Sequence, residues 1–238
     1  MQLFHIDADK IHIKWKNLEI FPVPELISQL RKVLRIQKWD KIYVQYSSKK
    51  WTTRFELSIL DRTDKNLEAE IISSKVFELD KRNVSMLIAM PNKREKAELI
   101  VQKLTEIWVQ NIYFWVSEHS IIRQWNDKKA SRLDKISREA VEQSRWIQLP
   151  EIKFIKSESE LRNFISWKNV IIANMNGLPY WEVVGNSNNN LCWVVWPEWW
   201  FSEKDLKLFE DAKIVDLWVN VLRMETASIV LWWILKNG

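Results

Sequence analysis

The sequence predicts an α/β protein whose main part is a mostly parallel, doubly wound sheet, preceded by a small β-rich unit. Three observations predict it. Beyond residue 84, short apolar strands alternate with amphipathic helices, the order that builds a parallel sheet covered by helices. Val84–Met90 is apolar except for Ser85, which is typical of a strand buried on both faces. Before residue 78 the chain instead offers several alternating strands and one helix.

The N-terminal unit begins with a strand or short hairpin over residues 1–14. A helix is expected over residues 24–35, where Ile27, Leu30, Val33 and Leu34 share one face. Three strands follow, over residues 40–45, 55–60 and 67–72. We place the domain boundary after residue 76, which gives domains 1–76 and 77–238.

The second domain continues with alternating elements. Helices are expected over residues 93–106, 128–144, 159–165 and 225–235, and strands over residues 112–116, 152–155, 170–173, 191–195 and 214–217. Ser202 and Asp205 have the spacing of a capping box and predict the start of one more helix.

Composition excludes several classes of site. The net charge of +5 is mildly basic, compatible with a nucleic-acid partner without requiring one. Cys192 is the only cysteine and the three histidines are scattered, so we expect no metal site. No apolar run approaches the ~18 residues that span a bilayer, and the N-terminus lacks a signal-peptide pattern. The sequence therefore predicts a cytoplasmic protein without a membrane partner.

Tryptophan and glycine have exchanged their usual frequencies. The chain has 16 Trp and 3 Gly, whereas glycine at about 7% would give roughly 17 residues. Trp39 stands between a helix and a strand, and Trp199–Trp200 stand before a helix, where turn chemistry favours glycine. The codon UGA is read as stop, Trp or Gly in different bacteria. We interpret many of these Trp letters as UGA codons that the source organism reads as glycine; the alternative is a tryptophan-rich protein.

Two segments after predicted strands carry the candidate chemistry. The first reads Trp196-Pro-Glu-Trp-Trp-Phe-Ser202, and the second reads Leu217-Trp-Val-Asn-Val-Leu-Arg-Met-Glu-Thr-Ala227. In an open α/β sheet, ligands bind at the carboxyl ends of strands. With glycine at positions 196, 199, 200 and 218, both segments become loops whose backbone can approach a ligand closely.

These segments resemble the signature of the 16S rRNA uridine-N3 methyltransferases of the SPOUT class, which runs Gly-Pro-Glu-Gly-Gly-(Phe/Leu)-Ser and then Leu-Gly-x-x-(Ile/Val)-Leu-Arg-x-Glu-Thr-(Ala/Thr). Weaker resemblances lie at Val33–Arg35, Lys93–Val109 and Glu139–Glu151. They cover nearly the whole chain in the family's order. The chain departs from the pattern in the Trp letters, and a Trp at position 196, 199 or 200 would fill the space of an adenosyl group.

The resemblance implies a fold and a function. The fold would be a PUA-like β-barrel that binds RNA, followed by a SPOUT-type domain whose mainly parallel sheet ends in a trefoil knot. The enzyme would methylate N3 of a uridine in 16S rRNA of the small ribosomal subunit, with S-adenosylmethionine as cofactor, and would act as a homodimer. Two alternatives stay open: a SPOUT ribose 2′-O-methyltransferase, or a non-catalytic RNA-binding protein if the loop Trp residues are real.

The resemblance also assigns residues. The cofactor would be held by Asn174, Trp196, Pro197, Glu198, Trp199, Trp200, Leu217, Trp218, Val219, Leu222, Arg223, Thr226 and Ala227. Glu198 and Arg223 are the catalytic candidates. A carboxylate near the sulfonium favours the cationic cofactor, and a guanidinium can stabilise the negative charge that builds on uracil oxygens. Each also has a plain alternative: for Glu198, a loop carboxylate that accepts backbone N–H groups, and for Arg223, a salt bridge to Glu225 or another carboxylate.

Basic residues are the candidates for RNA contacts. They are Arg31, Arg35, Lys93, Arg94, Arg132 and Arg145. Arg31 and Arg35 are four residues apart and would share one helical face. The alternative for every member of the set is an ordinary solvated surface.

Overall fold

The computed structural model describes residues 2–20, 24–48, 50–63, 66–79, 84–123, 125–184, 190–196, 202–216 and 222–237. The chain forms two compact units. The first contains residues 1–80 and 141–148, and the second contains residues 81–140 and 149–238.

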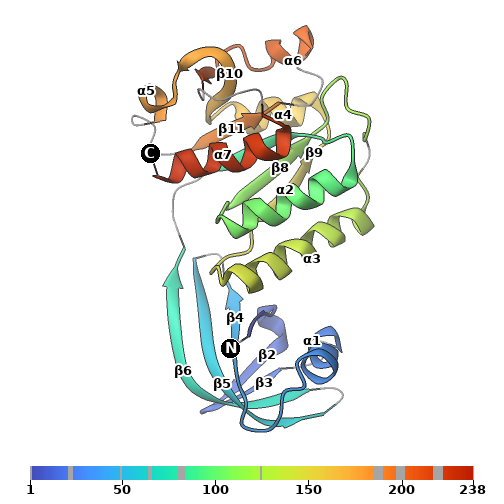
Figure 1. Ribbon diagram of the computed structural model, residues 1–238, viewed down its shortest axis with the longest axis vertical. Coiled ribbons are helices and arrows are strands. Elements are labelled where there is room, and N and C mark those ends of the chain that lie inside the picture. Colours follow the sequence, from blue (N-terminus) through green and yellow to red (C-terminus); the bar gives the residue numbers. More distant parts are fainter. Residues whose placement is uncertain are drawn as a thin grey trace. The chain divides into compact units, whose positions relative to one another are not determined.

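The first unit is built on a six-stranded sheet with its own core (Figure 1). Its strands are β1 (Leu3–His5), β2 (Ile11–Lys14), β3 (Asn17–Ile20), β4 (Lys41–Ser47), β5 (Trp51–Arg62) and β6 (Leu67–Glu78), in the order β1-β4-β5-β6-β3-β2. β1 and β4 are parallel, and the other neighbours are antiparallel. Alternate residues such as Phe55 and Leu57 point into the core. The strands predicted over residues 40–45, 55–60 and 67–72 are confirmed, although β5 and β6 are longer than the sequence pattern indicated. The possible hairpin over residues 1–14 is not formed, because β1 pairs with β4 and β2 pairs with β3, a strand that the sequence pattern did not predict.

The predicted helix over residues 24–35 is only partly correct. The chain forms α1 (Pro24–Ser28) and then one π-helical stretch, η2 (Gln29–Val33). Ile27 and Leu30 are buried as expected, but Val33 is 71% exposed. A π-turn holds more residues than an α-turn, so it rotates Val33 off the face that a regular helix would have buried.

The second unit contains a six-stranded sheet in which every neighbouring pair is parallel, in agreement with the mainly parallel sheet that the sequence predicted. Its strands are β7 (Ser85–Ala89), β8 (Asn111–Trp115), β9 (Glu151–Ile155), β10 (Asn169–Pro179), β11 (Leu191–Val195) and β12 (Lys213–Asp216), in the order β12-β10-β11-β7-β8-β9. On one side of β7 the neighbouring strands are β8 and then β9, in the order of the chain. On its other side β7 pairs with β11. The strand order therefore switches direction between β7 and β11.

Helices cover both faces of this sheet. They are α2 (Arg94–Glu106), α3 (Asp127–Ser144), α4 (Glu158–Ile165), α5 (Tyr180–Val184), α6 (Glu203–Lys207) and α7 (Met224–Asn237). Buried residues of α2, α3 and α7 pack with Met86 and Ile88 of β7. α4 and the residues that follow α6 pack with Leu87 and Ala89. These two residues alternate along β7 with Met86 and Ile88 and therefore point to the opposite face. Strand β7 is thus buried on both faces, as its apolar run predicted.

Three tryptophans occupy backbone positions that suit glycine. Trp15 is the first of two residues joining β2 to β3 and has φ 58°; a two-residue hairpin loop of this kind normally has glycine there. Trp39 has φ 74° at the third position of a turn closed by the Asp40 N–H and the Gln37 carbonyl (3.2 Å). Positive φ at that position is typical of a type II turn, which favours glycine.

Trp108 ends helix α2 in a Schellman motif. Its N–H donates to the Thr105 carbonyl (3.1 Å), and the Val109 N–H donates to the Leu104 carbonyl (2.9 Å). Trp108 itself has φ 76°, at the position where this motif normally has glycine. Left-handed backbone costs a residue with a side chain about 1–2 kcal/mol. Three turns of different types therefore have the geometry of glycine turns with Trp in that place.

Candidate functional site

The carboxyl ends of the parallel strands bring the candidate segments to one edge of the second sheet. Trp196 follows β11, and residues 217–221 follow β12. β10 lies between β11 and β12 and contains Asn174, which follows Ala173, the partner of Val215 near the end of β12. Lys93, just before α2, follows β7, the other neighbour of β11. In doubly wound sheets this edge, beside the switch in strand order, is where ligands bind.

The first candidate loop is described at its two ends. Trp196 is half-buried and packs against the core cluster shared with α4 and α6. Pro197, Glu198, Trp199 and Trp200 lie outside the described residues. At the far end, Ser202 caps α6 in the predicted capping box: the Asp205 N–H donates to Ser202 Oγ (3.1 Å), and the Ser202 N–H donates to Asp205 Oδ2 (3.2 Å).

The second candidate loop ends in helix α7. Leu217, Trp218 and Val219 lie outside the described residues. Leu222 is half-buried and Arg223 is exposed. The Ala227 N–H donates to the Arg223 carbonyl (2.8 Å), so the helical hydrogen bonds begin at the predicted arginine.

The first turn of α7 contains Glu225, which the sequence suggested only as a salt-bridge partner of Arg223. Arg223 and Glu225 form no ion pair with each other within the described residues; the ion pairs found in that part of the chain join other side chains. Oε2 of Glu225 is buried, and no group of the described residues donates a hydrogen bond to it. Thr226 is exposed, and Ala227 packs against the core. The site edge therefore presents a guanidinium and a carboxylate oxygen that needs a donor.

Strand β10 is irregular where it reaches this edge. Its pairing with β12 shifts between Ala173 and Leu178, and Asn174 opens the irregular stretch. A Cβ on Gly177 would lie 2.5 Å from the Val215 carbonyl carbon and 2.7 Å from the Asp216 nitrogen. Only glycine allows β10 to approach so closely the backbone that leads into residues 217–221.

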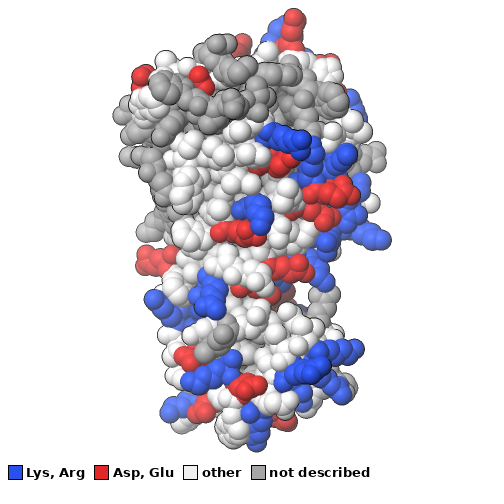
Figure 2. All heavy atoms as spheres, viewed as in Figure 1, with Lys and Arg blue, Asp and Glu red and all other residues white. Residues whose placement is uncertain are grey.

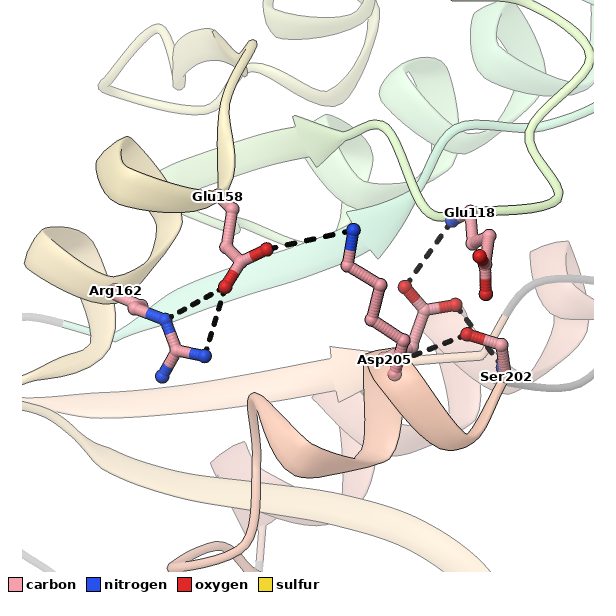
Figure 3. A network of polar contacts seen from close by, with 6 residues as sticks. Glu118, Glu158, Arg162, Ser202 and Asp205 are labelled. Atoms are coloured by element: carbon pink, nitrogen blue, oxygen red, sulfur yellow. Dashed lines mark hydrogen bonds and ion pairs between the residues drawn. The ribbon is translucent and has the colours of Figure 1, made fainter.

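The loop after β8 joins the first candidate loop through Asp205. Figure 3 shows the Asp205 carboxylate between the Ser202 and Glu118 backbones, and the Glu118 N–H donates to Oδ1 (3.3 Å). Nearby, Glu158 pairs with Arg162 (2.9 Å) and with the Lys204 ammonium (3.8 Å). Asp205 is 3% exposed. The sequence identified it as a cap, but its contact with a residue 87 positions away required the tertiary structure.

The basic candidates on α2 and α3 contact a shared carboxylate. Arg94 Nε lies 2.8 Å from Glu98, and Arg132 Nη2 lies 3.4 Å from the same carboxylate. Lys93 is exposed at the N-cap of α2. In the view of Figure 2, Lys and Arg alternate with Asp and Glu over α2 and α3. The surface is therefore mixed in charge, with Arg94 and Arg132 sharing the Glu98 carboxylate.

The three remaining basic candidates lie in the first unit. Arg31 is in η2, and Arg35 follows it with φ 50°. The expectation that they share a helical face is therefore wrong, since the helix ends between them. Arg145 has φ 56° and an exposed side chain.

A buried polar group that the sequence did not reveal holds the backbone beside Arg145. Gln45 accepts hydrogen bonds from Arg54 Nε (2.9 Å) and Nη2 (2.7 Å) and donates to the Trp146 carbonyl (2.8 Å). Arg54 also donates to the Arg145 carbonyl (2.9 Å). Burial, together with the Arg145 cation, lowers the pKa of Arg54. The sequence signal for this group was Gln45 at an alternating position of a predicted strand. That position indicates a buried amide only when its partner Arg54 is known.

Comparison with solved structures finds close matches of fold. A ribosomal RNA small subunit methyltransferase E from Neisseria gonorrhoeae, bound to S-adenosylmethionine, is 20% identical with a TM-score of 0.84, over 100% of this chain and 97% of that one. A Legionella pneumophila protein in complex with the same cofactor is 20% identical with a TM-score of 0.80, over 99% and 98%. A Porphyromonas gingivalis protein described as an rRNA methyltransferase is 22% identical with a TM-score of 0.79, over 98% and 97%.

These likenesses confirm the mainly parallel α/β fold class. No curated protein matches the chain. Among the described helices, none has the length and apolar character needed to cross a membrane. The model of the RNA methyltransferase domain family matches residues 78–236, which is most of the chain and the whole of the candidate edge. The chain belongs to the RNA methyltransferase family.

Proposed function

We propose that this RNA methyltransferase transfers a methyl group from S-adenosylmethionine to N3 of a uridine in 16S rRNA. The observation that carries the proposal is the edge of the second sheet: the two signature segments, far apart in the sequence, follow strands on either side of β10. The Neisseria protein with the same fold is a small-subunit rRNA methyltransferase. We place the reaction in the cytoplasm, where rRNA is made in bacteria.

We propose that the cofactor is held by residues 196–200, 217–219 and 222–223, with Asn174, Thr226 and Ala227. Of these, the structure describes Asn174, Trp196, Leu222, Arg223, Thr226 and Ala227. Among the described residues no group donates to the buried Oε2 of Glu225, and a hydroxyl or amino group of a ligand could supply the hydrogen bond. When bound, S-adenosylmethionine supplies an electrophilic methyl group on a sulfonium.

The chain's own residues would assist the transfer by charge. N3 of uracil must lose its proton, and negative charge then spreads to O2 and O4. Arg223 is exposed beside the proposed methyl donor and, within the described residues, forms no ion pair that would neutralise it. It would stabilise the uracil anion by donating hydrogen bonds. Glu198 would favour the cationic cofactor by Coulomb attraction.

The proposal includes glycine in the cofactor loops. Trp15, Trp39 and Trp108 stand in three turns with glycine geometry, and this supports reading Trp letters as glycine codons more widely. We propose that Trp196, Trp199, Trp200 and Trp218 are glycine in the native chain. Peptide masses of the protein isolated from its source would test this, since each replacement lowers the mass of its peptide by about 129 Da from the residue formulae. Tryptophan masses at these four positions would favour the non-catalytic reading.

Three further features rest on the family resemblance. We propose that residues 1–76 form a PUA-like barrel that binds RNA, that residues 77–238 form a SPOUT domain with a trefoil knot, and that the enzyme is a homodimer. Arg31, Arg35, Lys93, Arg94, Arg132 and Arg145 are the proposed RNA contacts. They would bind phosphates, and such binding weakens with salt.

The experiment is methyl transfer from labelled S-adenosylmethionine to small ribosomal subunits that lack the modification, with free 16S rRNA tested in parallel. Digestion to nucleosides then locates the methyl group. Label in 3-methyluridine supports the proposal, and label on ribose supports the 2′-O alternative. If the protein binds the cofactor but labels neither substrate, another RNA is methylated; if it binds RNA without binding the cofactor, the non-catalytic reading holds.

A further inference from the structure

Asp205 is a buried carboxylate that two separate loops share. Its two oxygens accept from different backbones: Oδ2 from Ser202, at the end of the loop after β11, and Oδ1 from Glu118, in the loop after β8. The residue is 3% exposed. Of the ion pairs formed within the described residues, none includes Asp205. Burying a carboxylate is costly unless hydrogen-bond donors surround it, and the Ser202 and Glu118 N–H groups are such donors.

Each of the two loops is braced on its own side. Ser117 and Ser120 side chains are 2.9 Å apart in a tight turn, and Arg123 donates to the Glu118 carbonyl (2.6 Å). On the other side, Leu208 and Phe209 anchor the end of α6 in the core. Asp205 therefore joins two braced segments, and Figure 3 shows its contacts with Glu118 and Ser202.

We propose that Asp205 is a positioning residue that fixes Ser202, the first described residue after the proposed cofactor loop, to Glu118 in the loop that follows β8. The inference rests on the proposed function, because the loop's ligand is the proposed cofactor. Because Asp205 already holds Ser202, the point where that loop enters α6 needs no ordering when the ligand binds. Such preorganisation strengthens binding because less ordering is needed when the complex forms.

The decisive variant is Asp205→Asn, which keeps the size of the side chain. An amide has one accepting oxygen, so at most one of the two loops retains its contact. We expect the dissociation constant for S-adenosylmethionine, measured by calorimetry, to rise about tenfold, the size of one lost hydrogen bond to a charged group. The Michaelis constant for the cofactor should rise in parallel, with a smaller change in kcat.

Two further variants separate positioning from capping. Ser202→Ala removes the Oγ acceptor of the capping box but leaves the Asp205 contact with Glu118. This variant should lower the unfolding temperature of the protein. It should change the dissociation constant for S-adenosylmethionine by less than about threefold, which is on the order of the experimental scatter when two variants are compared. Glu158→Gln makes the same carboxylate-to-amide change at an exposed residue drawn with Asp205 in Figure 3. It should leave the dissociation constant for S-adenosylmethionine unchanged.

The outcomes are distinct. If Asp205→Asn and Ser202→Ala weaken cofactor binding equally, Asp205 acts only as a helix cap and the inference is wrong. If Asp205→Asn binds the cofactor as tightly as the unaltered protein, the inference is also wrong. If the unaltered protein does not bind S-adenosylmethionine, the proposed function itself fails, and that result is recognisable without any variant.

Discussion

At the scale of the residue, backbone angle distinguishes one tryptophan from another. Trp39 has φ 74° in a turn, whereas Trp51 lies in strand β5, where it pairs with Glu78. Both side chains are exposed, 61% and 47%, so neither contributes much burial. The same replacement by glycine should therefore have opposite effects at the two positions.

Trp39→Gly should stabilise the protein by about 1 kcal/mol, because it removes left-handed strain that a residue with a Cβ cannot avoid. Trp51→Gly should destabilise it by about 0.5–1 kcal/mol, because glycine is less favourable in a strand. Urea unfolding of the two variants measures both changes. Equal destabilisation by both would mean that the turn at Trp39 is not strained.

Cys192 provides a second test at this scale. It is fully buried in β11, and this burial raises the pKa of its thiol to about 12. At pH 8, roughly one molecule in ten thousand would carry the thiolate, against about a quarter for a free cysteine. Iodoacetamide should therefore leave the native protein unlabelled at pH 8 and label it once per chain in urea. Rapid labelling without urea would show that β11 is accessible.

At the scale of the element, Gly177 allows β10 to reach its position beside β12. Gly177→Ala should destabilise the second unit by about 2 kcal/mol, because the new Cβ would meet backbone atoms that cannot rotate away. It should also weaken cofactor binding, since the displaced backbone of Val215 and Asp216 leads directly into residues 217–221. Urea unfolding and calorimetry measure the two effects.

The matched control is the next residue in the strand. Leu178 is 56% exposed, so Leu178→Ala should change stability by no more than about 0.5 kcal/mol. If both variants behave alike, the close approach at Gly177 does not limit the position of β10.

At the scale of the whole molecule, charge decides how RNA binding responds to salt. The net charge is +5, and Arg94 and Arg132 lie on either side of Glu98. If both arginines contact phosphates, each change to Gln should reduce the slope of log K against log salt by about one. Fluorescence anisotropy with a labelled 16S rRNA fragment, from 50 to 300 mM KCl as a typical range, would measure it.

Arg162 is the control for this experiment. It is exposed, pairs with a carboxylate as Arg94 does, and lies on α4, which covers the other face of the sheet. Arg162→Gln should leave the salt slope unchanged. Equal slopes for all three variants would show that α2 and α3 do not contact the RNA backbone.

The sequence by itself determined the order of the strands in the second unit and of every helix there except α5, the burial of β7, the capping box at Ser202 and the two signature segments. These properties depend on residues close together in the chain, through hydrophobic period and local hydrogen bonding. It also indicated glycine-type turns, because the anomaly lay in the composition itself.

Only the tertiary structure decided the rest. The π-helical stretch that exposes Val33, the contact of Asp205 with Glu118 and the network of Gln45 with Arg54 all depend on which distant backbone lies beside each side chain. The close passage of Gly177 beside β12 is of the same kind. The type of a single residue does not predict a partner far along the chain, because such a contact contributes free energy only after packing has brought the two backbones together.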